Sequence, residues 1–326
     1  MFLILGGGFG LYGYLPALIH GCGESVLLPL RYRERMGQRD DIRSLCDRVC
    51  WVVNEEQALD RAYAVVISKR PEDQLFWVDQ CLKRPNLVDL ILEKPLASSP
   101  ALALSLLDRL ERAGKNFRIS YLFRTTDWGR KLLEQFDQHQ NCEELNIEWQ
   151  FQAHHYRHNL GNWKRFTPQG GGALRFYGIH LIALLAELGY SSAEHSYLAG
   201  ASTDEAQSWH ATLSGQGLPT CCLGVDSNNV ASRFMVRSDN PARPVLVDLK
   251  DPFESSLPSA DLARFDSRLQ LLTQVCRSLK EDRAIYYPWY RRTLELWAQI
   301  EQETVHIGNS CPTALGLRSS DSNLNS

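Results

Sequence analysis

Short apolar runs alternate with segments of helical apolar spacing over the first part of the chain. The runs predict β-strands at Phe2–Leu5, Ser25–Leu30, Cys50–Val53, Ala64–Ser68, Leu87–Leu92 and Phe117–Ser120. The segments between them place apolar residues three or four apart and predict helices at Leu11–His20, Asp40–Cys46, Glu55–Leu59, Glu72–Lys83 and Ser98–Ala113. This alternation favours βαβ units with right-handed crossovers, hence a doubly wound parallel sheet of the α/β class.

The order of predicted elements changes in the rest of the chain, where several strands follow one another between helices. Helices are predicted at Asp127–Phe136, Gly171–Leu188, Leu262–Lys280 and Pro288–Glu303. Strands are predicted at Glu144–Ala153, Glu194–Leu198, Ser208–Ser214, Thr220–Val225, Ala231–Val236 and Val245–Leu249. We therefore expect a first domain over 1–121 and an α+β second domain with an open, largely antiparallel sheet over 122–308. The polar tail 309–326 is expected to be disordered.

The composition of the chain excludes some classes of binding partner. The chain has 326 residues, 35 Lys plus Arg against 38 Asp plus Glu, and a formal net charge of −3. No strong field draws such a protein to nucleic acid or to an anionic membrane. The longest apolar run, Leu181 to Leu188, is far shorter than the ~20 residues of a membrane span and contains Glu187. The nine cysteines lack zinc-finger spacing, and no basic leader precedes the first apolar run, so we expect a cytoplasmic protein with free thiols.

A glycine-rich turn follows the first predicted strand and precedes a helix. It reads Gly6-Gly7-Gly8-Phe9-Gly10-Leu11-Tyr12-Gly13. Glycines at such a turn let backbone N–H groups approach a pyrophosphate at the N-terminus of the helix. Two registers fit the dinucleotide pattern. One starts at Gly8 and ends at Gly13, and the other starts at Gly6 and places Leu11 in the third glycine position.

The ends of the other strands indicate which dinucleotide binds. The second strand is followed by Arg31 and Arg33 where a carboxylate would hold the ribose 2′-hydroxyl, so NADP is favoured and NAD stays possible. The fifth strand ends in Glu93-Lys94-Pro95, which places Lys94 at the carboxyl edge of the sheet, where ligands bind. We expect cofactor contacts from Gly6, Gly8, Phe9, Gly10, Arg31, Ser68, Glu93 and Lys94.

Four motifs follow one another along the chain: the glycine turn, Glu93-Lys94-Pro95, Tyr121-Leu122-Phe123-Arg124 and the segment from Gly170 to His180. Together they resemble the Gfo/Idh/MocA oxidoreductases, which include glucose–fructose oxidoreductase and inositol dehydrogenase. The resemblance covers about residues 2–190 by motif and the remainder by the order of elements. It implies an N-terminal Rossmann domain and a C-terminal domain that binds substrate and mediates oligomerisation, so a homodimer or homotetramer is expected.

The resemblance also implies a catalytic trio of lysine, aspartate and histidine. Lys94 and His180 match the first and third members, whereas the aspartate position falls on Phe176. Residues 176 and 180 share a helical face, so an aspartate there could share a substrate hydroxyl with His180. A second departure is Gln74, at the position of a histidine that members often carry after the fourth strand.

Several side chains are candidates for the substrate pocket. We expect substrate contacts from Arg124, Trp163, Lys164, Phe176 and Tyr177, with Trp163 as a stacking wall and Lys164 or Arg165 facing an anionic group. On a strand, His154 and His158 would share a face, which permits metal ligation. No carboxylate or cysteine completes that site nearby, so no metal is predicted.

Two hypotheses of function follow from these residues. In the first, the chain is an NAD(P)-dependent oxidoreductase that moves a hydride between nicotinamide and a carbonyl, imine or secondary alcohol of a small molecule, with Lys94 and His180 in proton transfer. In the alternative, it is an inactive dinucleotide-binding or sensor protein that keeps the fold, as Phe176 and the irregular glycine turn allow.

Overall fold

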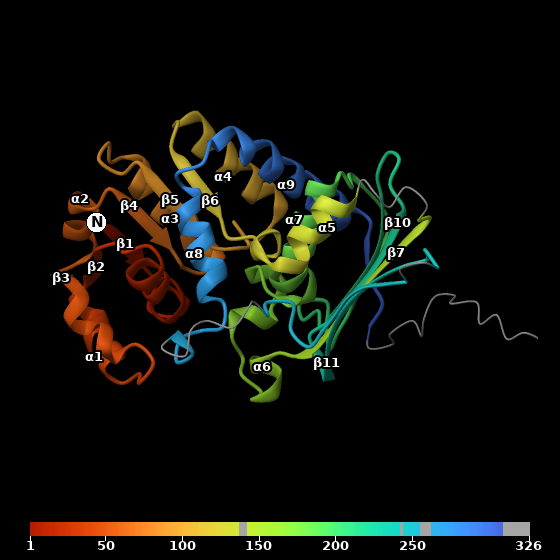
Figure 1. The fold of residues 1–326 in the computed structure, drawn as a ribbon, viewed down its shortest axis with the longest axis horizontal. Coiled ribbons are helices and arrows are strands. Elements are labelled where there is room, and N and C mark those ends of the chain that lie inside the picture. Colours follow the sequence, from red (N-terminus) through yellow and green to blue (C-terminus); the bar gives the residue numbers. More distant parts are fainter. Residues whose placement is uncertain (137–141, 242–243, 255–261, 309–326) are drawn as a thin grey trace, which may run out of the picture.

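The computed structural model describes residues 1–136, 142–241, 244–254 and 262–308, which form two sheets with helices between them (Figure 1). The first sheet has the order β3-β2-β1-β4-β5-β6, and every pairing in it is parallel. This is the strand order of a doubly wound dinucleotide-binding domain. Its strands are β1 (Phe2–Leu5), β2 (Val26–Pro29), β3 (Val49–Val52), β4 (Ala64–Ile67), β5 (Asp89–Leu92) and β6 (Asn116–Ile119).

Helices cover both faces of this sheet, as the alternating pattern predicts. They are α1 (Arg33–Gly37), α2 (Glu55–Arg61), α3 (Pro71–Leu82) and α4 (Pro100–Arg112). Side-chain caps begin two of them, because Asn54 accepts from the Gln57 N–H and Ser99 from the Leu102 N–H. The predicted helix at 11–20 is wound as two wide π-helical turns, Gly10–Tyr14 and Ala17–Gly21. The segment predicted as Asp40–Cys46 is instead a 3₁₀ helix, Arg43–Arg48, with only Leu45 buried.

The second sheet is mixed and mostly antiparallel, with the order β12-β11-β7-β10-β9-β8-β13. Its strands are β7 (Glu144–Gln152), β8 (Ser192–Ala199), β9 (Ser208–Ser214), β10 (Thr220–Asp226), β11 (Asn228–Ser238), β12 (Val245–Leu249) and β13 (Thr304–His306). The parallel pairs are β7 with β10 and β8 with β13. The predicted fold class, a parallel sheet followed by an open and largely antiparallel one, is confirmed.

Helices α5 (Asp127–Gln135), α6 (His154–Arg157), α7 (Ile179–Leu188), α8 (Leu269–Ser278) and α9 (Tyr287–Gln302) complete the fold. Figure 1 shows α7 and α9 between the two sheets. The predicted helix Leu262–Lys280 is regular only from Leu269, and its apolar face, including Leu272 and Val275, packs into the same core cluster as residues of the first sheet. The chain therefore returns to the first sheet after completing most of the second.

The segment Thr167–Leu188 is long and apolar enough to be a candidate membrane span. However, 72% of its most apolar window is buried inside the protein, as in the core helix of a folded domain. The segment begins with a 3₁₀ turn, Thr167–Gln169, and after Gly172 it continues as a π-helical turn at Ala173–Gly178 and as α7 from Ile179. This helix carries Phe176 and His180 into the space beside β5 and β6.

Candidate active site

The glycine turn closes tightly around the ends of β1 and β4. Gly6 has a φ of 147°, and a Cβ there would overlap the backbone oxygen of Ser68. A Cβ on Gly10 would lie 2.8 Å from Ile4, whereas one on Gly8 would meet no atom within 4 Å. Of the two registers, the one that starts at Gly6 fits this geometry: Gly6 makes the turn, Gly8 faces open space and Gly10 packs against the sheet.

Phe9 and Gly13 form a matched pair within the same turn. A Cβ on Gly13 would lie 2.5 Å from the Phe9 ring, so this glycine makes room for the aromatic side chain. The Leu11 N–H donates to the Gly8 carbonyl at 2.9 Å and closes the first helical turn. The first N–H groups of a helix have no partner within it, so the space at Gly8 fits an anionic group such as a pyrophosphate.

Arginines after β2 lie beside this turn. The Arg31 guanidinium forms an ion pair with Glu55, and its side chain stays 54% exposed. Arg35, one helical turn later, donates from Nη1 to the Gly7 carbonyl at 2.9 Å. Arg31 is a predicted cofactor residue and Arg35 is not, although their spacing of four residues places them on the same side of a helix.

Glu93 connects the glycine helix to the end of β5. The buried Tyr14 hydroxyl donates to Glu93 Oε1 at 2.7 Å and also pairs with the Ser120 hydroxyl. Burial raises the pKa of Glu93, and the charge of Lys94 and the Tyr14 hydrogen bond oppose this shift. Glu93 is thus held in place between three secondary-structure elements.

Gln74 positions the loop that carries Lys94. Its buried side-chain amide donates from Nε2 to the carbonyls of Glu93 at 3.0 Å and Pro95 at 2.8 Å, on either side of the lysine. An amide NH₂ has two protons, whereas a histidine nitrogen has at most one, so glutamine can serve both carbonyls from one atom. Gln74 therefore acts on Lys94 through the backbone.

Lys94 and Lys164 converge on Phe176. Lys94 Nζ donates to the Phe176 carbonyl at 2.7 Å and lies 3.7 Å from the centroid of its ring, while Lys164 Nζ lies 5.1 Å from the same centroid. Burial lowers the pKa of Lys94 to about 7; the charges of Lys164 and Arg268 act in the same direction and that of Glu93 opposes them. Both protonation states of Lys94 are therefore accessible near neutral pH.

Gly171 explains how Lys164 reaches this position. A Cβ on Gly171 would lie 2.6 Å from the carbonyl carbon of Lys164, so the glycine lets this segment pack directly on the start of the Phe176 helix. The neighbouring Trp163 ring meets the Phe176 ring edge-on at a centroid distance of 5.2 Å. Phe176 is thus enclosed by an aromatic ring and two lysines.

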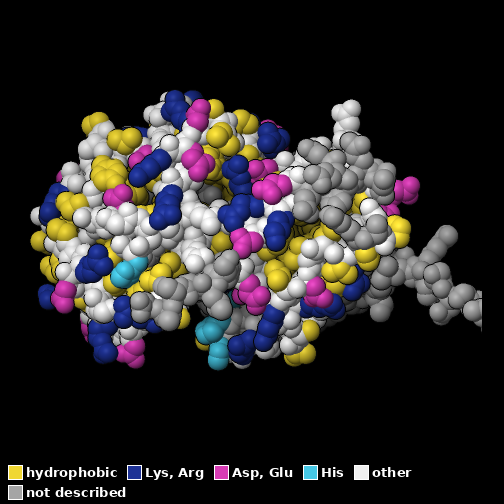
Figure 2. Space-filling view, viewed as in Figure 1, with side chains coloured by type: hydrophobic (Ala, Val, Ile, Leu, Met, Phe, Trp, Pro, Cys, Tyr) yellow, Lys and Arg dark blue, Asp and Glu magenta, His cyan; other side chains and the backbone are white. Residues whose placement is uncertain are grey.

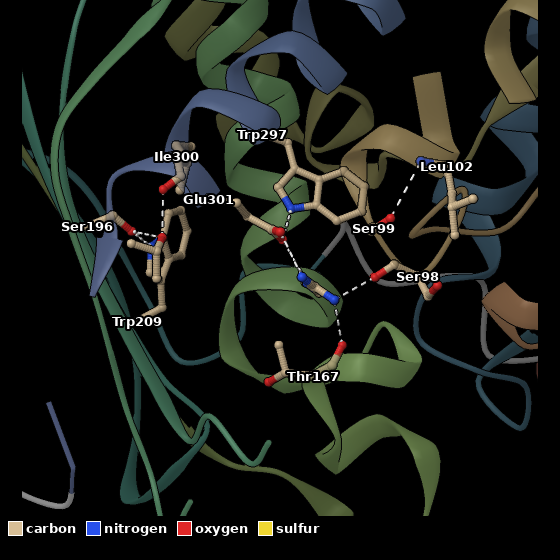
Figure 3. Close-up of polar contacts among 11 residues, drawn as sticks. Ser98, Ser99, Leu102, Thr167, Ser196, Trp209, Trp297, Ile300 and Glu301 are labelled. Atoms are coloured by element: carbon tan, nitrogen blue, oxygen red, sulfur yellow. Dashed lines mark hydrogen bonds and ion pairs between the residues drawn. The ribbon is translucent and has the colours of Figure 1, made fainter. Parts of the chain in front are cut away.

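Arg175 fixes the helix turn that carries Phe176, and Figure 3 labels its partners Ser98, Thr167 and Glu301. Its guanidinium forms two hydrogen bonds of 2.7 Å with Glu301 of α9. It also donates to the carbonyls of Ser98 at 2.7 Å and Thr167 at 2.8 Å. Trp297 donates to Glu301 in turn at 2.7 Å, which completes the network. Because Ser98 follows the Lys94 loop, Arg175 holds that loop and the Phe176 turn together.

His180 lies deeper in the same region. It is 1% exposed, its Nδ1 accepts the Leu122 N–H at 3.2 Å, and its ring packs against Phe123 and Phe253. Burial lowers the pKa of His180 well below its usual value, and the charges of Lys94 and Arg268 add to the effect. The ring is therefore neutral, with its proton on Nε2.

Arg268 is a further functional candidate that the sequence patterns did not predict. Asp266 holds its guanidinium through two hydrogen bonds of 2.8 Å, and the guanidinium carbon lies 4.3 Å from the centroid of the Phe9 ring. Its charge lowers the pKa values of Lys94 and Lys164. Only the return of the chain to the first domain brings Arg268 here, and its local sequence carries no signal of a site.

Of the other residues predicted to contact the substrate, Tyr177 lies at the site and Arg124 does not. Tyr177 packs against Phe176 and Phe151, at centroid distances of 4.8 and 4.7 Å. Arg124 lies apart from Lys94: it pairs with Glu187 at 2.8 Å and its guanidinium lies 4.9 Å from the rings of Tyr286 and Trp289. The site therefore brings together Lys94, Trp163, Lys164, Phe176 and Tyr177, but not Arg124.

The basic and histidine residues around position 160 have local partners. Arg165 pairs with Glu205 at 2.7 Å. His154 begins α6 and His158 directly follows its last residue, so neither lies on the predicted strand; their ring centroids are 4.4 Å apart. Within the described ranges, no group of three or more His, Cys, Asp or Glu side chains is arranged to hold a metal ion.

Comparison with known proteins identifies solved structures that have the same fold. No family model and no curated protein sequence matches the chain. Among solved structures, KijD10, a 3-ketoreductase from Actinomadura kijaniata in complex with NADP and TDP-benzene, has a TM-score of 0.68 at 16% identity over 94% of this chain and 98% of that one.

Two further structures have the same architecture. The WlbA dehydrogenase from Thermus thermophilus in complex with NAD and UDP-GlcNAcA has a TM-score of 0.65 at 14% identity, over 95% of this chain and 97% of that one. GenD2 from gentamicin A biosynthesis, in complex with NAD, has a TM-score of 0.67 at 13% identity over 93% of each chain. The chain therefore shares the fold of these three structures, a Rossmann-type parallel sheet followed by an open and mostly antiparallel one.

Proposed function

We propose that the chain is an NAD(P)-dependent oxidoreductase that transfers a hydride between nicotinamide and a carbonyl, imine or secondary alcohol carbon of a small molecule. The observation that carries the proposal is Lys94, whose pKa is lowered to about 7 at the strand end beside a glycine turn shaped for a dinucleotide. A bound nicotinamide supplies or accepts the hydride. The oxidoreductases with the same fold support this assignment.

Lys94 is the proton donor or acceptor in this proposal. In the reducing direction, its ammonium gives a proton to the substrate oxygen or nitrogen, and in the oxidising direction the neutral amine takes it back. The hydrogen bond to the Phe176 carbonyl and the Gln74 contacts orient the amine. His180, neutral with its proton on Nε2, contributes a hydrogen-bond donor and holds the Leu122 backbone in place.

The charges around the site favour a substrate with an anionic portion. Lys164 and Arg268 bring positive charge to the region of Lys94, and Trp163 and Phe176 form an aromatic wall. Of the compared proteins, KijD10 holds TDP-benzene and WlbA holds UDP-GlcNAcA. We propose a substrate of this kind, with a phosphate or carboxylate next to a reducible or oxidisable carbon.

NADP is the proposed cofactor, with NAD possible. Arg31 is exposed enough to bind a 2′-phosphate if it leaves Glu55, since an arginine matches phosphate geometry. We also propose a cytoplasmic homodimer or homotetramer. The alternating strand Ser208–Ser214 leaves one sheet face to be covered, and light scattering that gives only the monomer mass, unchanged on dilution, would contradict this assembly.

The test is to titrate the purified chain with NADPH and NADH by fluorescence and then to follow cofactor absorbance with a panel of carbonyl compounds that includes nucleotide-linked keto sugars. Saturable NADPH binding with turnover of at least one member supports the proposal. Saturable binding without turnover across the panel favours the alternative of a dinucleotide-binding sensor. Absence of binding to both cofactors refutes both hypotheses.

A further inference from the structure

A second polar cavity lies apart from the proposed active site. It has a volume of about 660 Å³ and is lined by residues of β6, α5, α8, the start of α9 and the segment Tyr121–Thr125. The Leu122 N–H faces His180, whereas its neighbours Tyr121 and Arg124 line the cavity. Figure 2 shows basic and acidic side chains gathered on this face, where α5, α8 and α9 of Figure 1 meet.

Several polar atoms of this cavity have no hydrogen-bond partner within the described part of the chain. They are the Tyr121 hydroxyl, Arg124 Nη1, Arg118 Nε and Glu187 Oε2, all of them buried. Tyr121 is only 2% exposed and Arg118 1% exposed. A buried polar group without a partner is costly, so such groups mark places where a ligand or ordered water completes the bonding.

The lining carries more positive than negative side chains. Arg118, Arg124, Arg130 and Arg277 face Glu134, Glu187 and Glu281. Backbone carbonyls occupy some of the arginine donors, as Arg118 donates to Ser278 and Glu281 and Arg277 to Gly21. Arg124 and Arg130 have carboxylate partners, Glu187 and Asp127, whereas carbonyl oxygens satisfy the N–H groups of Arg118 and Arg277 without cancelling their charge. The cavity therefore favours an anion over a cation.

Aromatic side chains supply the rest of the wall. Tyr286, Trp289 and Tyr290 line one side, from the start of α9. The volume lies within the ~300–1,000 Å³ typical of small-molecule sites, which combine apolar walls with a few placed polar groups. Arginine side chains and the Tyr121 hydroxyl next to these aromatic rings suit a ligand that has a carboxylate or phosphate joined to a ring.

We propose that this cavity is a second small-molecule site, distinct from the hydride-transfer site, for a small organic anion that carries a ring. Arg124 and the Tyr121 hydroxyl bind its carboxylate or phosphate, and the aromatic residues of α9 contact its ring. Glu187 keeps the Arg124 guanidinium oriented through its ion pair.

The experiment measures binding of phenyl phosphate, benzoate and benzyl alcohol to the full chain by calorimetry, with the protein saturated with NADPH. We expect saturable binding of at least one of the two anions and at least tenfold weaker binding of neutral benzyl alcohol. Tyr121→Phe should weaken anion binding at least threefold without lowering the melting temperature, because the hydroxyl it removes has no partner among the described residues.

Two further variants make the result decisive. Arg124→Gln combined with Glu187→Gln removes the ion pair without leaving a buried charge, and should abolish anion binding. Arg268→Gln is the matched control, since it removes a cation of the other site and should leave this binding unchanged. The proposal is overturned if neither anion binds, if Tyr121→Phe and the double variant bind as the wild type does, or if only Arg268→Gln abolishes binding.

Discussion

Two basic regions of this protein differ in what their cations can do. Around Phe176, Lys94 is buried among other cations, and its pKa is lowered to about 7. In the second cavity, Arg124 is paired with Glu187, and an arginine keeps its charge at any physiological pH. A lysine whose pKa burial lowers to about 7 can move a proton near neutral pH, whereas an arginine that stays charged can only hold an anion. The choice of residue and of neighbours thus separates a chemical site from a binding site.

Replacing Lys94 tests this difference most strongly. Lys94→Ala should lower turnover by ~10²–10⁴-fold while NADPH affinity stays within a few fold, because a positioned proton donor contributes about that much. Lys94→Arg should lower turnover nearly as much, since the guanidinium keeps the charge but does not release its proton. Steady-state rates and a cofactor titration check both variants. Full turnover in either one would show that Lys94 does not transfer the proton.

Phe176→Asp places a carboxylate at the position where the resemblance implies an aspartate. The new charge should raise the pKa of Lys94 and place a carboxylate against the anionic or apolar substrate. We expect roughly tenfold lower kcat/KM on the native substrate, equivalent to ~1.4 kcal/mol of lost complementarity. Phe176→Leu, which removes the ring but adds no charge, is the control. Higher activity of the aspartate variant would contradict this account of the pocket.

Cofactor preference depends on a third basic region, after β2. Arg31→Ala should lose about tenfold in NADPH affinity and leave NADH binding unchanged, because a charged hydrogen bond to phosphate is worth about 1.5–3 kcal/mol. Glu55→Gln should have the opposite effect by releasing Arg31 from its ion pair. Fluorescence titration measures both. Equal wild-type affinities for the two cofactors would refute the preference.

The pH dependence of kcat/KM is the smallest expected effect, and it reports directly on the protonation of Lys94. Reduction requires the ammonium form of Lys94, so kcat/KM should be flat below its pKa of about 7 and fall as pH rises above it. Lys164→Gln removes a charge that lowers this pKa, so the descending limb should move to higher pH. Arg124→Lys, in the other basic region, should leave the limb in place. A limb that does not respond to Lys164→Gln would show that another group titrates.

Much of the architecture could be predicted from local signals. The alternation of apolar runs and amphipathic segments was sufficient for the parallel sheet, and Gly6 to Gly10 marked the turn at its edge. Lys94 was identifiable because a residue at the carboxyl end of a parallel strand must lie where ligands bind. The prediction of a helix at Leu262–Lys280 was wrong at its start, since Phe265 and Asp266 lie before the first regular turn at Leu269.

The sequence by itself determined which elements form and in what order, because hydrophobic period, glycine turns and caps act over a few residues. Only the tertiary structure decided which side chains meet. It brought Arg268 over Phe9, placed Lys164 beside Phe176 and turned Arg124 into the second cavity with Glu187. These pairings join residues distant in the chain, and they depend on how the two sheets and the returning α8 pack, which no local pattern encodes.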